Sequence, residues 1–123
     1  MNGVVLYIDD SQDNILIVQR LLKRKCPDVQ LRTAMTGRDG ITAAIDDQPT
    51  LILLDNRLPD TSGEQLLREL AAIPATAAIP VVILSGDTNP LTVNELLAAG
   101  AADFLAKPFN IHELVEIVGR YLH

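Results

Sequence analysis

The chain has 123 residues, and 16 Asp and Glu against 10 Lys and Arg give it a formal net charge of −6 at pH 7. This length is typical of one domain, and 48% hydrophobic residues suffice for a core without a disulfide or a metal. The acidic balance argues against direct nucleic-acid binding, which requires clustered Lys and Arg. A single cysteine, no apolar run near membrane-spanning length and no cleavable leader predict a cytoplasmic domain without membrane contact.

Short apolar segments alternate with segments of helical periodicity along the chain. Strands are predicted at residues 4–8, 29–33, 51–54, 81–84 and 102–106, and helices at 14–25, 36–47, 62–72, 91–99 and 111–122. Three of the apolar segments are nearly continuous, which is typical of parallel strands covered on both faces. Five consecutive strand–helix pairs therefore predict an α/β fold with right-handed crossovers, a parallel sheet and helices on both faces.

Local signals refine the predicted helix ends. Ser62 with Gln65 three residues later predicts a capping box, and Gly100 predicts the end of the fourth helix. In the last helix, Ile117 and Tyr121 lie off the inner apolar stripe. They fit the edge of the core and a partner-binding face equally well.

Polar side chains follow four of the five predicted strands. Asp9 and Asp10 follow the first strand, Asp55 the third, Ser85 the fourth and Lys107 the fifth. Each has an ordinary structural explanation, such as a helix cap, a turn or a solvated surface lysine. Ligands of an open α/β sheet bind beyond the carboxyl ends of the strands, however, so we expect these side chains to meet at one edge.

The chemistry of these residues is interdependent. Three adjacent carboxylates repel one another unless a cation neutralises them, and Mg²⁺ prefers such hard oxygen ligands. Lys107 adds a fixed positive charge, and the Ser85 hydroxyl could donate to an oxygen of a bound phosphoryl group. Positioning and charge neutralisation of this kind support phosphoryl transfer. Asp55, on the middle strand, is the best candidate for a nucleophile that becomes an aspartyl phosphate.

The motifs carrying these residues are those of a known family. They are Asp9-Asp10 in LYIDDS, Asp55, Pro59 and Gly63 in LLDNRLPDTSG, Ser85 in VVILSGD, and Lys107-Pro108-Phe109 in AGAADFLAKPF. With them the sequence resembles a response regulator receiver domain of two-component signal transduction over essentially all of residues 1–123. The resemblance implies a doubly wound, flavodoxin-like (βα)5 domain with strand order 2-1-3-4-5.

The resemblance also implies a set of roles. Asp55 is phosphorylated by a histidine kinase or a histidine phosphotransfer protein. Mg²⁺ is held by Asp10, Asp55 and the backbone carbonyl of Arg57, with Asp9 acting through water. Phosphorylation draws Ser85 toward the phosphoryl group and turns Phe104 inward, which reshapes the surface of the fourth helix, fifth strand and fifth helix. The Lys107–Pro108 peptide bond is expected to be cis.

The resemblance also implies that Arg57 and Asp87, two residues after Asp55 and Ser85, flank the phosphoryl group and tune its lifetime. We expect these two side chains to pair across the mouth of the site and restrict the access of water. Gly86 has the opposite effect, because it leaves the site uncrowded.

Other functions fit the sequence less well. A haloacid-dehalogenase-type phosphohydrolase needs an acid where Arg57 stands, and a docking module without phosphorylation would not require the complete residue set. Nucleotide-binding glycine motifs are absent from the sequence. We therefore expect a signalling switch rather than an enzyme, with a downstream protein effector, and a monomer or a weak phosphorylation-linked dimer. A stand-alone regulator, a relay intermediate and a receiver of a hybrid sensor kinase all remain open.

Overall fold

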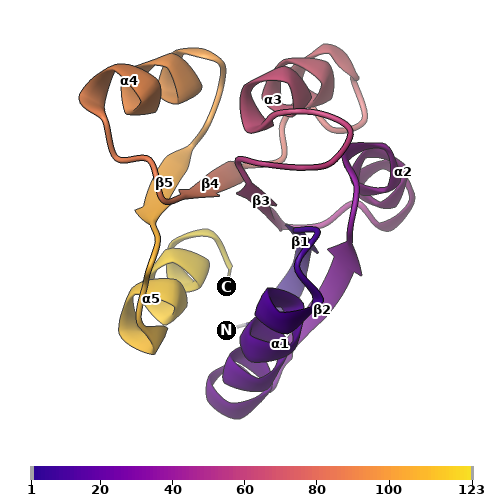
Figure 1. The fold of residues 1–123 in the computed structure, drawn as a ribbon. Coiled ribbons are helices and arrows are strands. Elements are labelled where there is room, and N and C mark those ends of the chain that lie inside the picture. The colour runs from indigo at the N-terminus through magenta and orange to yellow at the C-terminus, as the bar shows by residue number, and fades with distance from the viewer. Residues whose placement is uncertain (1, 123) are drawn as a thin grey trace.

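The computed structural model describes residues 2–122, in which five parallel strands alternate with five helices (Figure 1). The strands are β1 Gly3–Ile8, β2 Val29–Ala34, β3 Leu51–Asp55, β4 Val81–Ser85 and β5 Asp103–Ala106. The helices are α1 Gln12–Lys25, α2 Gly37–Asp47, α3 Gly63–Ala72, α4 Pro90–Ala98 and α5 Ile111–Tyr121. The sheet order β2-β1-β3-β4-β5 confirms the expected doubly wound topology. No helix among the described residues has the length and apolar character needed to cross a membrane.

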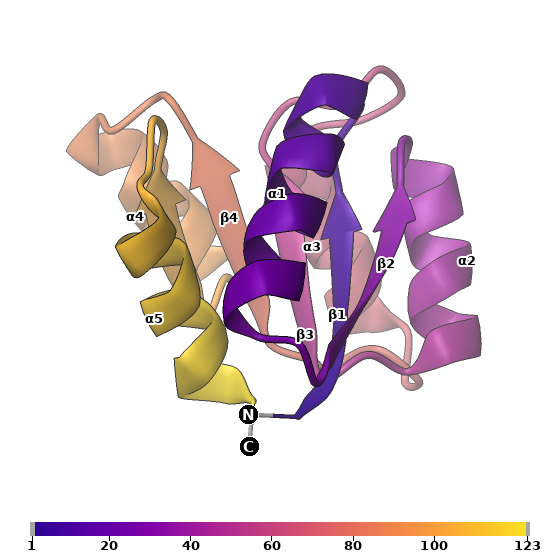
Figure 2. The same ribbon diagram turned by 90° about the horizontal axis from the view of Figure 1, so that it is seen from below.

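Helices cover both faces of the sheet, with α1 and α5 on one face and α2, α3 and α4 on the other (Figures 1 and 2). Successive strand side chains point to opposite faces, so each strand contributes to two separate apolar cores. In β1, Val5 and Tyr7 pack with α1 and α5, while Leu6 and Ile8 pack with the other three helices.

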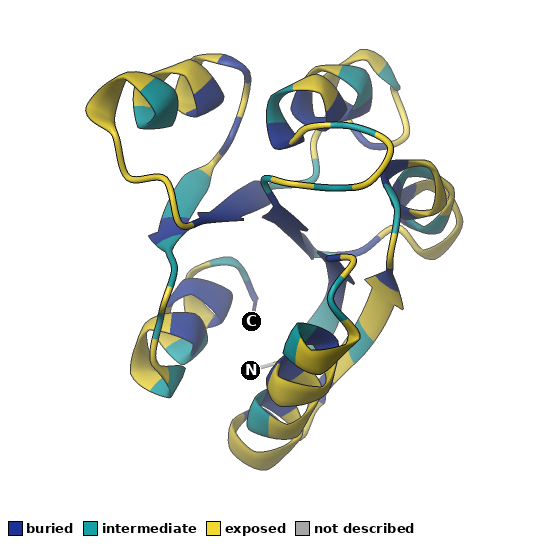
Figure 3. Cartoon of the chain, in the orientation of Figure 1, coloured by how far each residue is buried: buried dark blue, intermediate teal, exposed yellow. Residues whose placement is uncertain are grey.

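The two central strands β3 and β4 are buried along their whole length (Figure 3). This explains their nearly continuous apolar sequences, because both faces of each strand lie against helices. Their last residues, Asp55 and Ser85, are polar and buried. A buried polar residue at the end of an apolar strand is costly unless it is paired, which marks this edge of the sheet as a site.

Several helix ends differ from the sequence prediction. Helix α1 begins at Gln12, two residues earlier than expected, because the Ser11 side chain caps it by accepting from the Asn14 N–H. Ser62 caps α3, but the reciprocal Gln65 contact of a capping box is not formed. A complete capping box instead opens α5, between Asn110 and Glu113. Gly100 does follow the end of α4, with a φ of 117°.

The structure places both residues of the last helix whose role the sequence left open. Ile117 is buried in the core between the sheet and helices α1 and α5. Tyr121 packs at the edge of the same core, and its hydroxyl donates to the Ala102 carbonyl oxygen and to Asp103 Oδ2, both at 3.3 Å. Both residues therefore belong to the core or its margin.

Candidate functional site

The strand register brings the predicted site residues to one edge. Ile8 of β1 lies beside Leu54 of β3, so Asp9 follows at the level of Asp55. Asp55 lies beside Leu84 of β4, and Ser85 beside Ala106 of β5. The parallel strands thus deliver Asp9, Asp55, Ser85 and Lys107 in order across the sheet, with Asp10 next along the chain.

Three carboxylates gather here as the sequence predicts. Ligand oxygens of Asp9, Asp10 and Asp55 lie within 4.8 Å of one another. Lys107 Nζ lies 3.3 Å from Asp55 Oδ2 and 3.9 Å from Asp9 Oδ2. Asp9 and Asp55 are buried, whereas Asp10 is exposed. A set of hard oxygen donors, partly buried and open on one side, fits Mg²⁺, which retains several of its waters.

Asp9 is the most constrained member of the cluster, with no exposed surface. Its Oδ2 accepts from the Tyr7 hydroxyl at 2.5 Å and from Asn14 Nδ2 at 3.4 Å, and its Oδ1 accepts from the Ser11 N–H at 2.9 Å. Because these donors engage both oxygens, the arrangement suits a residue that meets a cation through water. Sequence reasoning missed Tyr7 and Asn14, because a tyrosine inside a buried strand predicts core packing rather than a contact with Asp9.

Burial and the close approach of these acidic groups shift the pKa values of Asp55 and Tyr7. Burial, the largest cause, raises the pKa of the Asp55 carboxyl; Lys107 opposes that shift and the charge of Asp9 adds to it. Burial and the hydrogen bond to Asp9 raise the pKa of Tyr7 far above its ordinary value, so its hydroxyl remains a donor at neutral pH. An added cation near Asp55 would favour its ionised form.

A pocket of about 680 Å³ opens above the cluster, and Asp10, Asp55, Ser85 and Lys107 line it. One rim is formed by residues 56–59 and the other by Gly86 and Asp87. A Cβ built on Gly86 meets no atom within 4 Å, so the space beside this position is open.

The prediction of an ion pair between Arg57 and Asp87 is wrong, since the described residues show no such pair. Both residues line the pocket, but no ion pair joins them. The Asp87 carboxylate instead accepts from the Asn89 N–H at 3.0 Å and from Thr92 Oγ1 at 3.1 Å, which commits it to the start of α4. The Arg57 N–H donates to Asp55 Oδ1 at 3.3 Å.

The residues expected to switch lie around the pocket. The Ser85 hydroxyl oxygen accepts from the Asp87 N–H at 3.0 Å, which leaves its own proton available for donation. Phe104 is half-buried against the core that includes α3 and α4. The Lys107–Pro108 peptide bond is cis, as expected.

Comparison with known proteins identifies the family. The model of the response regulator receiver domain matches residues 5–119. The chain is 33% identical over 110 residues to response regulator PleD of Caulobacter vibrioides, covering 89% of this chain and 24% of that protein. It is 35% identical over 112 residues to the KDP operon transcriptional regulatory protein KdpE of Escherichia coli, covering 89% of this chain and 47% of that protein.

Solved structures agree. The chemotaxis response regulator CheY4 of Vibrio cholerae superimposes with a TM-score of 0.90 at 26% identity, covering 99% of this chain and 100% of that one. A receiver domain of a sensor histidine kinase from Pseudomonas aeruginosa, with a magnesium ion coordinated in its active site cleft, gives a TM-score of 0.87 at 26% identity and 98% coverage of both chains.

The chain belongs to the response regulator receiver domain family. It is a receiver of two-component signalling, and receivers of this family act as phospho-accepting switches and bind Mg²⁺ in an acidic pocket. The chain spans about a quarter to a half of the length of the curated relatives above.

The Tyr7 hydroxyl gives a first test of the site's internal support. In Tyr7→Phe, the buried Asp9 loses one of its donors, and we expect the free energy of unfolding to fall by about 1–2 kcal/mol. Urea denaturation measures the change. Tyr121→Phe is the control, because its hydroxyl makes longer bonds at the margin of the core and should cost less. Equal losses in both variants would contradict a special role for the Asp9 contact.

Proposed function

We propose that Asp55 accepts a phosphoryl group from a histidine kinase or a histidine phosphotransfer protein. The observation that carries the proposal is the convergence of three carboxylates within 4.8 Å on Lys107, whose ammonium lies 3.3 Å from Asp55. In this proposal Asp10, Asp55 and the backbone carbonyl of Arg57 bind Mg²⁺, and Asp9 acts through water. The bound Mg²⁺ would neutralise charge on the transferring group.

The chemistry is a direct displacement at phosphorus. A carboxylate oxygen of Asp55 forms the new P–O bond while the P–N bond to the donor histidine breaks, and the imidazole nitrogen keeps the electron pair. Lys107 pairs with charge on the acceptor, and the Ser85 hydroxyl, free to donate, hydrogen-bonds a phosphoryl oxygen. Hydrolysis by water returns Asp55 to a carboxylate and releases phosphate. The domain promotes only these two reactions.

The proposed output is a change of surface. Movement of Ser85 toward the phosphoryl group and inward rotation of Phe104 would reshape the face made by α4, β5 and α5, where a downstream protein effector would bind. Arg57 and Asp87, on opposite rims of the pocket, would each tune access of water without pairing. We propose a monomer or a weak phosphorylation-linked dimer. We also propose that the domain extends over residues 1–123, although residues 1 and 123 lie outside the described part.

Small phosphodonors test this function without the natural partner. Incubation with acetyl phosphate and Mg²⁺ should add one phosphoryl group, measured by intact-protein mass spectrometry, and chelation of Mg²⁺ should remove the gain. Phosphoramidate, which presents a P–N bond as phosphohistidine does, should act likewise. If neither donor labels the protein in Mg²⁺, the proposal is contradicted.

A further inference from the structure

The loop between β3 and α3 forms one rim of the phosphorylation pocket and is closed as a tight turn. Arg57 and Ser62 pair as an antiparallel bridge, and the Leu58 N–H donates to the Thr61 carbonyl oxygen at 3.3 Å. The Gly63 N–H donates to the Asn56 carbonyl oxygen at 2.9 Å. These bonds fix the base of the turn next to Asp55 and leave Pro59 and Asp60 at its tip.

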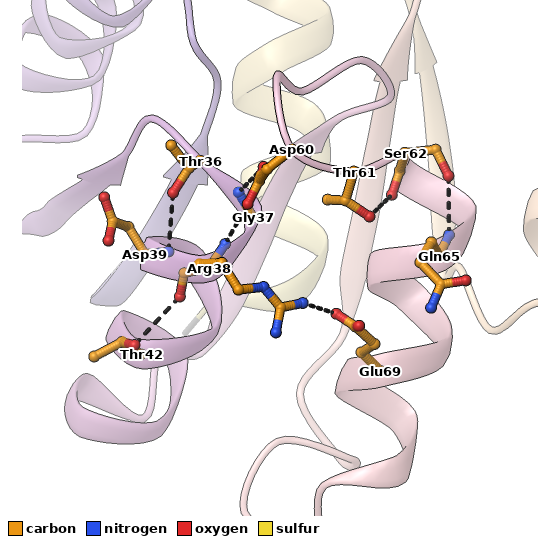
Figure 4. Close-up of polar contacts among 10 residues, drawn as sticks. All are labelled: Thr36, Gly37, Arg38, Asp39, Thr42, Asp60, Thr61, Ser62, Gln65 and Glu69. Carbon is orange, nitrogen blue, oxygen red and sulfur yellow. Dashed lines mark hydrogen bonds and ion pairs between the residues drawn. The ribbon is translucent and has the colours of Figure 1, made fainter.

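The tip is fastened to a different element. Asp60 Oδ1 accepts from the Gly37 N–H at 2.8 Å, and Asp60 Oδ2 accepts from the Arg38 N–H at 3.0 Å, both in the first turn of α2 (Figure 4). The side chain of Thr36, the helix's own cap, accepts from the Asp39 N–H at 3.0 Å, one residue beyond the two donors that Asp60 binds. Asp60 therefore supplies acceptors for two backbone donors that α2 cannot satisfy by itself.

The surrounding residues are arranged for this close approach. A Cβ on Gly37 would lie 2.4 Å from Thr61 Cγ2, so a larger residue there would push the turn away from α2. An ion pair between Arg38 and Glu69 of α3 adds a second, solvent-exposed link. The two N–H donors lower the pKa of Asp60, which keeps its carboxylate ionised as both bonds require.

We propose that Asp60 is a positioning residue for the phosphorylation pocket. By tying the turn to α2, it holds the rim residues 56–59 in place, including Arg57, whose N–H donates to Asp55 and whose carbonyl is the proposed Mg²⁺ ligand. This inference rests on the proposed function of that pocket. It predicts that a contact three residues from Arg57, made to a helix outside the pocket, sets the affinity for the metal.

The test compares two caps of the same helix. We expect Asp60→Ala to weaken Mg²⁺ binding about tenfold, as loss of an outer support of a metal site does, measured by isothermal titration calorimetry. Asp60→Asn keeps one carbonyl acceptor and should lie between Asp60→Ala and the wild type. Thr36→Ala is the matched control, because it removes a cap bond of α2 without touching the turn, and it should leave the Mg²⁺ affinity unchanged.

A second readout does not depend on the metal. Amide hydrogen exchange of residues 56–62 in the metal-free protein should be faster in Asp60→Ala and unchanged in Thr36→Ala. Wild-type affinity and exchange in Asp60→Ala, or equal effects of the two variants, would overturn the inference. If the wild type itself bound no Mg²⁺ while exchange changed as expected, the proposed function and the metal role would fail, and only the mechanical tie would stand.

Discussion

Asp55→Asn is expected to remove all phosphoryl labelling and, at the same time, to make the metal-free protein more stable. The labelling is lost because an amide is a poor nucleophile for phosphorus. The stability rises because the raised pKa of Asp55 means that its ionised form is unfavourable in the folded state. Removing that charge, with other carboxylate oxygens within 4.8 Å, should raise the free energy of unfolding by on the order of 1 kcal/mol.

The gain should depend on pH in a defined direction. The folded-state pKa of Asp55 lies above its unfolded value of 3.8, so the wild type is penalised fully at pH above the folded-state pKa. As pH falls through the folded-state pKa toward 3.8, the wild type recovers and the advantage of Asp55→Asn disappears. Thermal unfolding across this range measures it, with Asp28→Asn, an exposed acid outside the cluster, as the control. A destabilised Asp55→Asn at neutral pH would contradict this electrostatic picture.

Lys107→Met should have the second largest effect. It should lower the stability of the metal-free protein, whereas Asp55→Asn should raise it. The substitution keeps an apolar stem but leaves Asp9 and Asp55 without their cationic partner. We expect the free energy of unfolding of the metal-free protein to fall by about 1–2 kcal/mol, because the lysine is partly exposed and the acids are buried. Labelling by acetyl phosphate should slow by about 100-fold, as when one preorganised electrostatic group is removed.

Mg²⁺ provides the internal control for this variant. A cation bound among the acids replaces part of the missing charge, so Mg²⁺ should raise the melting temperature of Lys107→Met by more than that of the wild type. Lys107→Arg, which retains the charge, should stay close to the wild type in the metal-free state. An equal Mg²⁺ effect in Lys107→Met and the wild type would show that the lysine and the metal do not share these carboxylates.

The core of the site was predictable because it depends on strand ends. A buried parallel strand has a strong apolar pattern, and the residue after it has a fixed place at the sheet edge. The sequence alone therefore predicts one site at the sheet edge that contains Asp9, Asp10, Asp55, Ser85 and Lys107.

Contacts between separate elements were not predictable in this way. The two hydrogen bonds between Asp60 and α2 join residues that are 23 and 22 positions apart in the sequence. Their donors are backbone N–H groups, which carry no sequence signature. The prediction of an Arg57–Asp87 ion pair was wrong because it considered only the opposite charges of the two side chains. The carboxylate of Asp87 instead accepts hydrogen bonds from two nearby donors, the Asn89 N–H and the Thr92 hydroxyl. Tyr7 was hidden by its strand, where an aromatic residue predicts core packing and gives no sign of its polar tip.

The site of modification is the most direct test of the central claim. The protein phosphorylated with acetyl phosphate and Mg²⁺ can be reduced with borohydride, which converts an acyl phosphate into an alcohol, and then digested and sequenced by mass spectrometry. The modified residue is expected to be Asp55 alone. Modification of Asp9, Asp10 or any other residue, with Asp55 unchanged, would contradict the assignment of Asp55 as the phosphoacceptor.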